Sequence, residues 1–360
     1  MRNYNVYLRK DGRWEGRIYM PENKTRKRKY RSFFGKTREE AERKISAYIA
    51  ELKKTSSVSA TLGQVFSEWL GSVTIRVKEA TIANYTMKAR KHILPVFGEK
   101  QILDISAESV YRFIETKQKE NLSGRYIADI IVLMKSIFKY AAKMYHFINP
   151  LDGMTLPKKK TTEIRLLDTE QQHQLLQHIQ KHTTATTLGV ALSLFMGLRI
   201  GELCALQWSD VDLKKRILTV RKTVQRIQCS GEVKKTKLII TEPKSESSKR
   251  IIPIPDDLIP LISCFRSDTD NYILSGSKKL IEPRTMQYRF CRILNNVKLP
   301  SIHFHALRHM FASNCIRLGF DVKSLSELLG HSSVEITMNR YVHSSLDDKK
   351  IYMNRIRFAI

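Results

Sequence analysis

Two linker-like stretches constrain what this chain of 360 residues can fold into, because they divide it into three differently patterned parts. The first stretch is TSSVSAT (55–61), and the second is NPLDGMTLPKKKTTE (149–163). Runs of serine, threonine, proline and glycine are typical of connections rather than of packed helices or strands. We therefore predict three domains, over residues 1–55, 60–150 and 164–360.

The first part has the pattern of a small sheet backed by a helix. The runs NVYLRK and RWEGRIYM flank Asp11-Gly12, a pair typical of tight hairpin turns, and KYRSFFG offers a third strand. Thr37 and Glu40 have the spacing of a capping box and precede a run with apolar residues on one helical face. The sequence thus predicts a three-stranded sheet plus one helix.

The second and third parts differ in periodicity. Segments such as SGRYIADIIVLMKSIFKYAAKMY predict an all-helical second domain. The third part begins with the helical segment EQQHQLLQHIQKH and an apolar helix at 187–196, continues with the strand-like runs RILTVRKTVQRI, KLIITEP and RIIPIP, and returns to helices. The predicted fold class is therefore a multidomain α+β protein, with a small sheet plus helix, an all-helical domain, and a mainly helical domain containing a small antiparallel sheet.

A strong excess of positive charge points to a polyanionic partner. The formal net charge is +28, and residues 1–55 alone hold 17 basic against 7 acidic residues. Nucleic acid is the simplest such partner, and a solvated basic surface is the alternative. The segment KTRKRKYR (24–31) lies beside the predicted hairpin, where basic side chains can meet phosphates or form a solvated loop. The predicted DNA contacts there are Arg26, Lys27, Arg28, Lys29 and Arg31.

Cysteine use and apolar runs indicate where such a chain works. The five cysteines are scattered without a C-x-x-C motif, which argues against a disulfide framework or a cysteine zinc site and favours a reducing cytoplasm. The longest strongly apolar run, LGVALSLFMGL (188–198), is shorter than the roughly 18 residues of a membrane span. We expect a cytoplasmic protein with no signal peptide and no membrane partner.

The stretch HFHALRH (303–309) raises the choice between a metal site and an anion site. His305 and His309 share a helical face, as the two zinc ligands do in an H-E-x-x-H motif, but Ala306 replaces the glutamate of that motif. Arg308 lies among apolar residues, and a buried arginine requires an anion. The stretch therefore favours an anion site, and neither a metal nor a cofactor is expected.

Two more segments carry candidate residues. In MGLRIGELCAL (196–206), Arg199 lies at the start of a helix, where free N–H groups add to its charge and favour an anion. An Arg199–Glu202 ion pair is the alternative reading. Near the carboxyl end, SELLGHSSVEITMNRYVH places His331 in a turn and Tyr341 at the end of a helix. Tyr341 alone would more simply be a core aromatic residue.

Taken together, R-I-G-E-L, H-A-L-R-H, L-G-H and a tyrosine ten residues further on resemble the motifs of the tyrosine recombinase (integrase) family. The resemblance covers essentially the whole chain and is strongest to integrases of conjugative transposons and lambda-like phages. It implies an arm-type DNA-binding domain over 1–55, a helical core-binding (SAM-like) domain over 60–150, and a catalytic domain with a C-terminal tail over 164–360.

The same resemblance implies the site. The catalytic residues it implies are Arg199, Lys244, His305, Arg308, His331 and Tyr341. Tyr341 would attack the scissile phosphate, while the arginines and histidines stabilise charge on its oxygens. Lys244 would protonate the leaving oxygen, with Lys249 and Lys237 as alternatives for that role. Glu202 would support the first arginine.

The implied activity is site-specific recombination through a 3′-phosphotyrosyl intermediate and a Holliday junction, for integration or excision of a mobile element. The implied partners are double-stranded DNA at core and arm attachment sites, three further copies of the chain in a homotetramer on DNA, an excisionase and a DNA-bending protein. Such a protein would work at the bacterial nucleoid. The alternatives are an architectural or regulatory DNA-binding protein with a vestigial site, and a type IB topoisomerase. A metal-dependent nuclease is disfavoured because no carboxylate or cysteine cluster accompanies the histidines.

Overall fold

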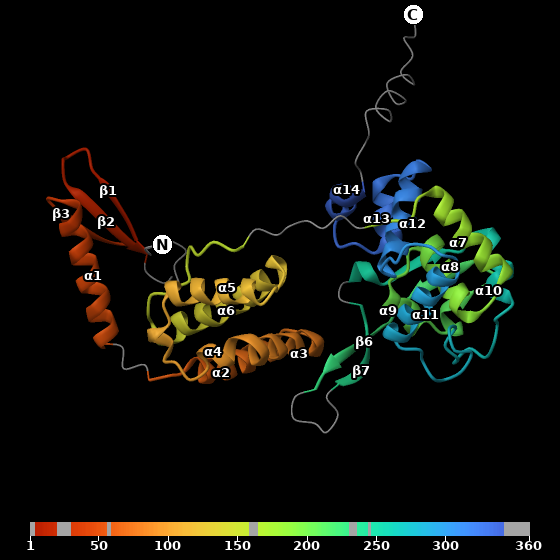
Figure 1. Cartoon of the computed structure of the whole chain (residues 1–360), viewed down its shortest axis with the longest axis horizontal. Coiled ribbons are helices and arrows are strands. Elements are labelled where there is room, and N and C mark those ends of the chain that lie inside the picture. The colour runs from red at the N-terminus through yellow and green to blue at the C-terminus, as the bar shows by residue number, and fades with distance from the viewer. Residues whose placement is uncertain are drawn as a thin grey trace, which may run out of the picture. The chain divides into compact units, whose positions relative to one another are not determined.

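The computed structural model describes residues 4–19, 30–55, 59–157, 165–229, 236–243 and 246–341 (Figure 1). The chain forms two compact units, one of Met1–Thr162 with Ile227–Lys235 and one of Glu163–Arg226 with Thr236–Ile360. The boundary after Thr162 falls within the second linker-like stretch. No helix of the described residues is long and apolar enough to cross a membrane.

The amino-terminal part is the expected sheet plus helix. Strands β1 (Tyr4–Leu8), β2 (Trp14–Tyr19) and β3 (Tyr30–Gly35) are antiparallel in the order β1-β2-β3. Helix α1 (Arg38–Thr55) packs against this sheet, and its Ile45 is fully buried. A Cβ atom at Gly16 of β2 would lie 2.2 Å from Cδ1 of Ile45, so a larger residue at that position would displace the Ile45 side chain. The hairpin and the helix are thereby confirmed.

A buried carboxylate organises the opposite face of this sheet. Glu15 is next to Gly16 on β2 and therefore points away from α1. It is 2% exposed and accepts hydrogen bonds of 2.7–2.9 Å from Tyr7, Arg9, Arg17 and Ser32. The hydrogen bond from Arg17 outweighs the opposing effect of burial, and the pKa of Glu15 falls to about 2. This ionised group holds Arg9 and Arg17 on one outward face.

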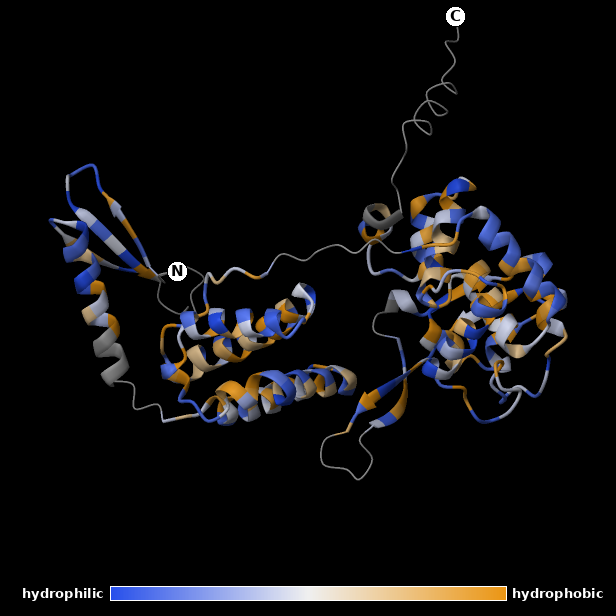
Figure 2. Ribbon diagram, viewed as in Figure 1, coloured by the Kyte–Doolittle hydropathy of each residue, from blue (hydrophilic) through white to orange (hydrophobic). Residues whose placement is uncertain are grey.

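The rest of the first unit is helical, as predicted. Its helices are α2 (Leu62–Thr74), α3 (Glu79–Lys88), α4 (Leu94–Phe97), α5 (Ala107–Lys119) and α6 (Gly124–Tyr145), with a π-helical turn η1 (Ala89–Ile93) and a 3-10 turn η2 (Ile102–Asp104). Thr61 begins α2 with a capping box to Gln64. In Figure 2, α5 and α6 carry apolar residues on one side and polar residues on the other. Burial of these apolar sides forms a separate core.

The second unit is mixed and mainly helical. Its helices are α7 (Thr169–Lys181), α8 (Ala185–Met196), α9 (Ile200–Ala205), α10 (Ile259–Ser263), α11 (Pro283–Asn296), α12 (His305–Arg317), α13 (Val322–Leu329) and α14 (Val334–Tyr341). Short 3-10 turns are η3 (Trp208–Asp210), η4 (Glu246–Ser248) and η5 (Asp256–Leu258). Helix α8 is apolar on nearly every side because it packs against α7, α9, α11 and α12.

The remaining strands form two small sheets, of which the first is antiparallel. One sheet has the order β4-β5-β8, from β4 (Val211–Asp212), β5 (Ile217–Val220) and β8 (Arg250–Pro253). The other pairs β6 (Thr223–Gln228) with β7 (Thr236–Thr241). The run RILTVRKTVQRI, continuous in sequence, is therefore divided between two sheets at 221–222. Apolar alternation predicted its strands but could not assign their partners.

The end of α8 offers a test of local packing. Gly197 has a left-handed backbone (φ 64°), and a Cβ atom there would lie 2.6 Å from Cδ1 of Phe311. Gly276 has a similar φ of 62°, but a Cβ atom added there would have no neighbouring heavy atom within 4 Å. Gly276→Ala should cost about 1–2 kcal/mol of unfolding free energy for its backbone conformation alone. Gly197→Ala should cost about 1–3 kcal/mol more, from the clash with Phe311.

Urea unfolding of the two variants beside the wild type measures this difference. Because the φ angles of Gly197 and Gly276 nearly match, the difference between the two losses isolates the contribution of side-chain packing at Gly197. Equal losses in the two variants would contradict the packing at Gly197.

Candidate active site

The largest fully buried side chain among the described residues is a predicted site residue. Arg308 on α12 is 1% exposed. Its Nη1 donates to the carbonyl oxygen of Gly197 at 2.8 Å, and its Nη2 to that of Leu329 at 2.6 Å. These carbonyls end α8 and α13, where the helix dipoles are negative. Part of the compensation that a buried arginine requires is thus supplied by the partial negative charge of backbone carbonyl oxygens, which no sequence motif marks.

Arg199 occupies the amino-terminal cap of α9, as predicted. Its Nη1 donates to Oε1 of Glu202 at 2.6 Å, and its backbone N–H donates to Oε2 at 3.0 Å. Its Nη2 donates to the carbonyl oxygen of Gly330 at 3.1 Å. The ion pair considered from sequence is therefore formed. The side chain nevertheless keeps 34% exposure, so the guanidinium remains accessible to an anion from solvent.

Arg250, at the start of β8, was missed by the sequence reasoning. It is buried, and its Nη1 and Nη2 donate to Oε1 and Oε2 of Glu202 at 3.1 and 2.9 Å. Its Nε donates to the carbonyl oxygen of Leu328 at 2.7 Å. One signal could have found it. Side chains alternate between the two faces of a strand, so in RIIP the side chain of Arg250 lies on the same buried face as that of Ile252. This alternation indicates an arginine that points into the core.

The three arginines converge on the end of α13. The carbonyl oxygens of three successive residues there, Leu328, Leu329 and Gly330, accept from Arg250, Arg308 and Arg199 respectively. Gly330 has the left-handed conformation (φ 63°) that ends the helix. The structure therefore brings together residues that lie up to 131 positions apart.

The predicted histidines lie near these arginine contacts in sequence, one directly after the end of α13 and the other at the start of α12. His331 follows Gly330 directly, and its Nδ1 is 2.8 Å from Oγ1 of the buried Thr337. His305 begins α12, one turn before Arg308, and is exposed. His309, whose spacing first resembled a metal motif, is buried, and its ring contacts that of His305 edge to face with centroids 4.8 Å apart.

Glu202 accepts hydrogen bonds from both Arg199 and Arg250, and its lowered pKa predicts that the stability of the fold depends on pH. Burial by itself raises its pKa, but the charges and hydrogen bonds of Arg250 and Arg199 more than offset this and lower the pKa to about 2. Because the folded pKa is depressed, the stabilisation is complete above the unfolded value near 4.5 and is lost as pH falls toward 2. The contribution is of the order of 3 kcal/mol.

The stabilisation contributed by ionised Glu202 is tested by measuring unfolding free energies with urea denaturation between pH 6 and pH 2. Glu202→Gln should be less stable than the wild type at neutral pH, and the difference should narrow as pH falls below about 4.5. Parallel stability curves for the two proteins would show that Glu202 is not held ionised by its arginines.

Several predicted residues cannot be compared with the structure. Lys244 and the segment Arg26–Lys29 lie outside the described residues, and of Tyr341 the structure describes the backbone, as the last residue of α14. Of the alternative lysines, Lys249 forms an ion pair with Glu242 at 3.0 Å. Arg31 lies on β3 with its guanidinium 4.4 Å from the ring centroid of Tyr48 on α1.

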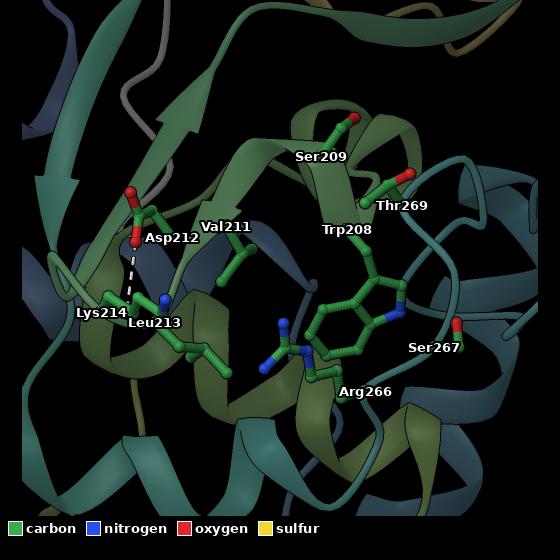
Figure 3. A pocket seen from close by; sticks show the side chains of 9 residues that line it. All are labelled: Trp208, Ser209, Val211, Asp212, Leu213, Lys214, Arg266, Ser267 and Thr269. Carbon is green, nitrogen blue, oxygen red and sulfur yellow. Dashed lines mark hydrogen bonds between the residues drawn. The ribbon is translucent and has the colours of Figure 1, made fainter.

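A pocket in the second unit lies apart from these residues (Figure 3). The residues that line it are Trp208, Ser209, Val211, Asp212, Leu213, Lys214, Arg266, Ser267 and Thr269. The predicted catalytic residues are not among them. The indole nitrogen of Trp208 is buried and has no hydrogen-bond partner within the described parts of the chain.

Comparison with family models and curated proteins gives consistent results. The model described as "Phage integrase family" matches residues 165–347, and that described as "Phage integrase, N-terminal SAM-like domain" matches residues 61–118. A tyrosine recombinase XerC-like protein of Caldanaerobacter subterraneus subsp. tengcongensis is 30% identical over 346 residues, covering 87% of this chain and 88% of that protein. The ICEBs1 integrase of Bacillus subtilis is 25% identical over 328 residues, covering 85% and 86%.

Solved structures share the fold. The Tn1549 transposon integrase in complex with a circular intermediate DNA has a TM-score of 0.70 at 22% identity, covering 83% of this chain and 100% of that chain. A lambda integrase tetramer bound to a Holliday junction has a TM-score of 0.61 at 19% identity, covering 95% of this chain and 97% of that chain.

Proposed function

The chain belongs to the phage integrase family of tyrosine recombinases, and we propose that it cleaves and rejoins DNA at specific sites for the integration or excision of a mobile element. The observation that carries this proposal is the convergence of Arg199, Arg308 and His331 at the end of α13. The relatives reported above are recombinases and integrases, and nothing in the comparisons supports an architectural protein or a type IB topoisomerase.

The first chemical step is attack on a phosphodiester. The oxygen of Tyr341 would form a bond to phosphorus while the bond from phosphorus to the 5′ oxygen breaks, leaving a 3′-phosphotyrosyl link. Negative charge develops on the equatorial oxygens, and guanidinium groups such as Arg199 suit that charge because they donate in a planar, bidentate fork. Such donors act most strongly when they are already held in place, as Arg308 is by Gly197 and Leu329.

Two proton transfers accompany this step. Tyrosine has an ordinary pKa near 10, so Tyr341 needs a base or a strongly cationic site, and we assign that role to His305, exposed at the start of α12. The leaving 5′ oxygen needs a proton, and we assign its delivery to Lys244, with Lys249 and Lys237 as alternatives. Glu202 would hold Arg199 in place.

The reverse step rejoins DNA. A 5′ hydroxyl from another strand attacks the phosphotyrosyl link and releases Tyr341, so bond energy is conserved and no cofactor is consumed. Exchange of one pair of strands produces a Holliday junction, and exchange of both pairs requires four active sites. We therefore propose a homotetramer on DNA, working at the bacterial nucleoid with an excisionase and a DNA-bending protein.

DNA binding would be divided among the predicted domains. We propose that residues 1–55 bind arm sites, that 60–150 bind the core site, and that 164–360 carry out catalysis. In the first, Arg9 and Arg17 lie on the sheet face opposite α1, and Arg31 of β3 lies beside Tyr48 of α1. The other predicted contacts, Arg26, Lys27, Arg28 and Lys29, lie between β2 and β3 in sequence. A sheet face with arginines can enter a DNA groove and meet phosphates.

The proposal is tested by trapping the covalent intermediate without metal ions. The protein is incubated in EDTA with nicked duplexes recovered from a random-sequence library by selection for adducts that resist SDS. The cleaved fragment diffuses from the nick, so the phosphotyrosyl link accumulates. An adduct that forms in EDTA is expected, because side-chain cations rather than metal ions stabilise the phosphate; cleavage that requires a divalent metal would refute the mechanism.

A further inference from the structure

We propose that Arg250 is a positioning residue of the recombination reaction, which shares Glu202 with Arg199 and thereby leaves the positive charge of Arg199 uncompensated toward the scissile phosphate. This inference rests on the proposed function, because Arg199 is assigned there to the phosphate. It adds a residue that does not itself touch the DNA and acts through its two neighbours.

The geometry at Glu202 supports sharing. Oε1 accepts from Nη1 of Arg199 at 2.6 Å and from Nη1 of Arg250 at 3.1 Å. Oε2 accepts from the backbone N–H of Arg199 at 3.0 Å and from Nη2 of Arg250 at 2.9 Å. Arg250 therefore binds the carboxylate with two guanidinium nitrogens, and Arg199 contributes one guanidinium nitrogen and a backbone N–H. Two cations on one anion leave one positive charge in excess.

Burial decides where that excess charge lies. The side chains of Arg250 and Glu202 are 5% and 3% exposed, whereas that of Arg199 is 34% exposed. An unpaired charge in the interior is costly, so the two buried members neutralise each other. The excess charge is left on Arg199, the member that solvent and a phosphate can reach.

The alternative pairing explains why Arg250 is needed. A carboxylate and a guanidinium favour two parallel hydrogen bonds. Without Arg250, both oxygens of Glu202 would be available to Arg199, and the pair would be neutral. Arg250 occupies one edge of the carboxylate and so prevents this neutralisation.

Arg250 also fastens the turn that carries His331. Its Nε donates to the carbonyl oxygen of Leu328, and its Nη1 donates to that of Ser248 at 3.2 Å. A Cβ atom at Gly330 would lie 3.0 Å from Cδ of Arg250, so the arginine packs directly against this glycine. One side chain thus connects β8, α9 and the end of α13.

The test separates charge from structure by using two substrates. One is the selected nicked duplex with its natural phosphodiester, and the other carries a methylphosphonate at the scissile position, where a methyl group replaces one charged oxygen. Arg250→Met should form the SDS-resistant adduct about 10- to 100-fold more slowly than wild type on the phosphodiester. On the neutral methylphosphonate the loss should be at least about tenfold smaller, because less charge needs stabilising.

Matched controls make the result specific. Arg216→Met removes another arginine paired with a carboxylate, since Arg216 forms an exposed ion pair with Asp256 at 2.7 Å, and it should react like wild type. Thermal unfolding verifies that each variant is folded. If Arg250→Met does not fold, Arg250→Gln replaces it, because glutamine removes the positive charge but keeps an N–H donor toward Glu202; its loss should again be larger on the phosphodiester.

The outcomes distinguish the two proposals. A folded Arg250 variant that reacts like wild type, or that loses equal activity on both substrates, would overturn the positioning role while leaving recombination intact. A library selection in which wild-type protein yields no SDS-resistant adduct would instead overturn the proposed function itself.

Discussion

Replacing Tyr341 by phenylalanine is expected to abolish the covalent protein–DNA adduct while leaving DNA binding intact. The substitution removes one oxygen atom, which is the proposed nucleophile, and keeps the aromatic ring at the end of α14. Because no other group would then be placed to attack the phosphorus, the rate of adduct formation should fall by at least about 10⁴-fold. Denaturing gels of the EDTA reaction measure the adduct, and gel shifts under native conditions measure binding.

A tyrosine elsewhere in the same unit provides the control. Tyr288 lies exposed on α11, so Tyr288→Phe removes the same hydroxyl from a position outside the proposed site. It should form the adduct at the wild-type rate. An adduct that persists in Tyr341→Phe, or that disappears equally in Tyr288→Phe, would refute the assignment of the nucleophile.

Replacing Arg308 by lysine is expected to reduce both activity and stability. Lysine keeps the charge, but a single ammonium group cannot reproduce the planar fork that joins the carbonyl oxygens of Gly197 and Leu329. Leaving one of these buried carbonyls without its donor should cost about 1–3 kcal/mol of unfolding free energy. Loss of an ordered donor to the phosphate should slow adduct formation by about 10²–10³-fold.

Arg317→Lys, at the exposed end of the same helix α12, is the matched control for this substitution. Urea unfolding and the adduct assay should both give values near wild type for it. If Arg308→Lys retained wild-type stability, the two carbonyl contacts would not be important for the fold; if it retained the cleavage rate, Arg308 would not contact the phosphate.

The local elements could be predicted from sequence because short-range interactions determine them. Thr37 and Glu40 were expected to cap a helix, and the backbone N–H of Glu40 does donate to Oγ1 of Thr37 at 3.2 Å. Asp168, two residues before the predicted helical segment EQQHQLLQHIQKH, caps α7 by accepting from the backbone N–H of Gln171. In both cases the donor and the acceptor lie within a few residues of each other, so the motif contains all the information needed.

The identity of the chemistry was also present in the sequence. Arginine, histidine and tyrosine at the spacings of R-I-G-E-L, H-A-L-R-H and L-G-H were sufficient to predict the family, which the comparisons confirm. These side chains are rare enough in combination that their order along the chain is distinctive. The roles of the individual residues remain predictions that the experiments above test.

Tertiary structure alone decided how those residues are supported. Arg308 reaches the carbonyl of Gly197 across 111 positions, and Arg250 reaches Glu202 across 48. Backbone carbonyls occur at every residue, so a sequence cannot indicate which of them will accept from a buried arginine. The chain by itself therefore determined which groups could act on a phosphate. Packing at the end of α13 determined that Arg250 and Glu202 are buried while Arg199 stays partly exposed, because burial depends on segments far apart in the sequence.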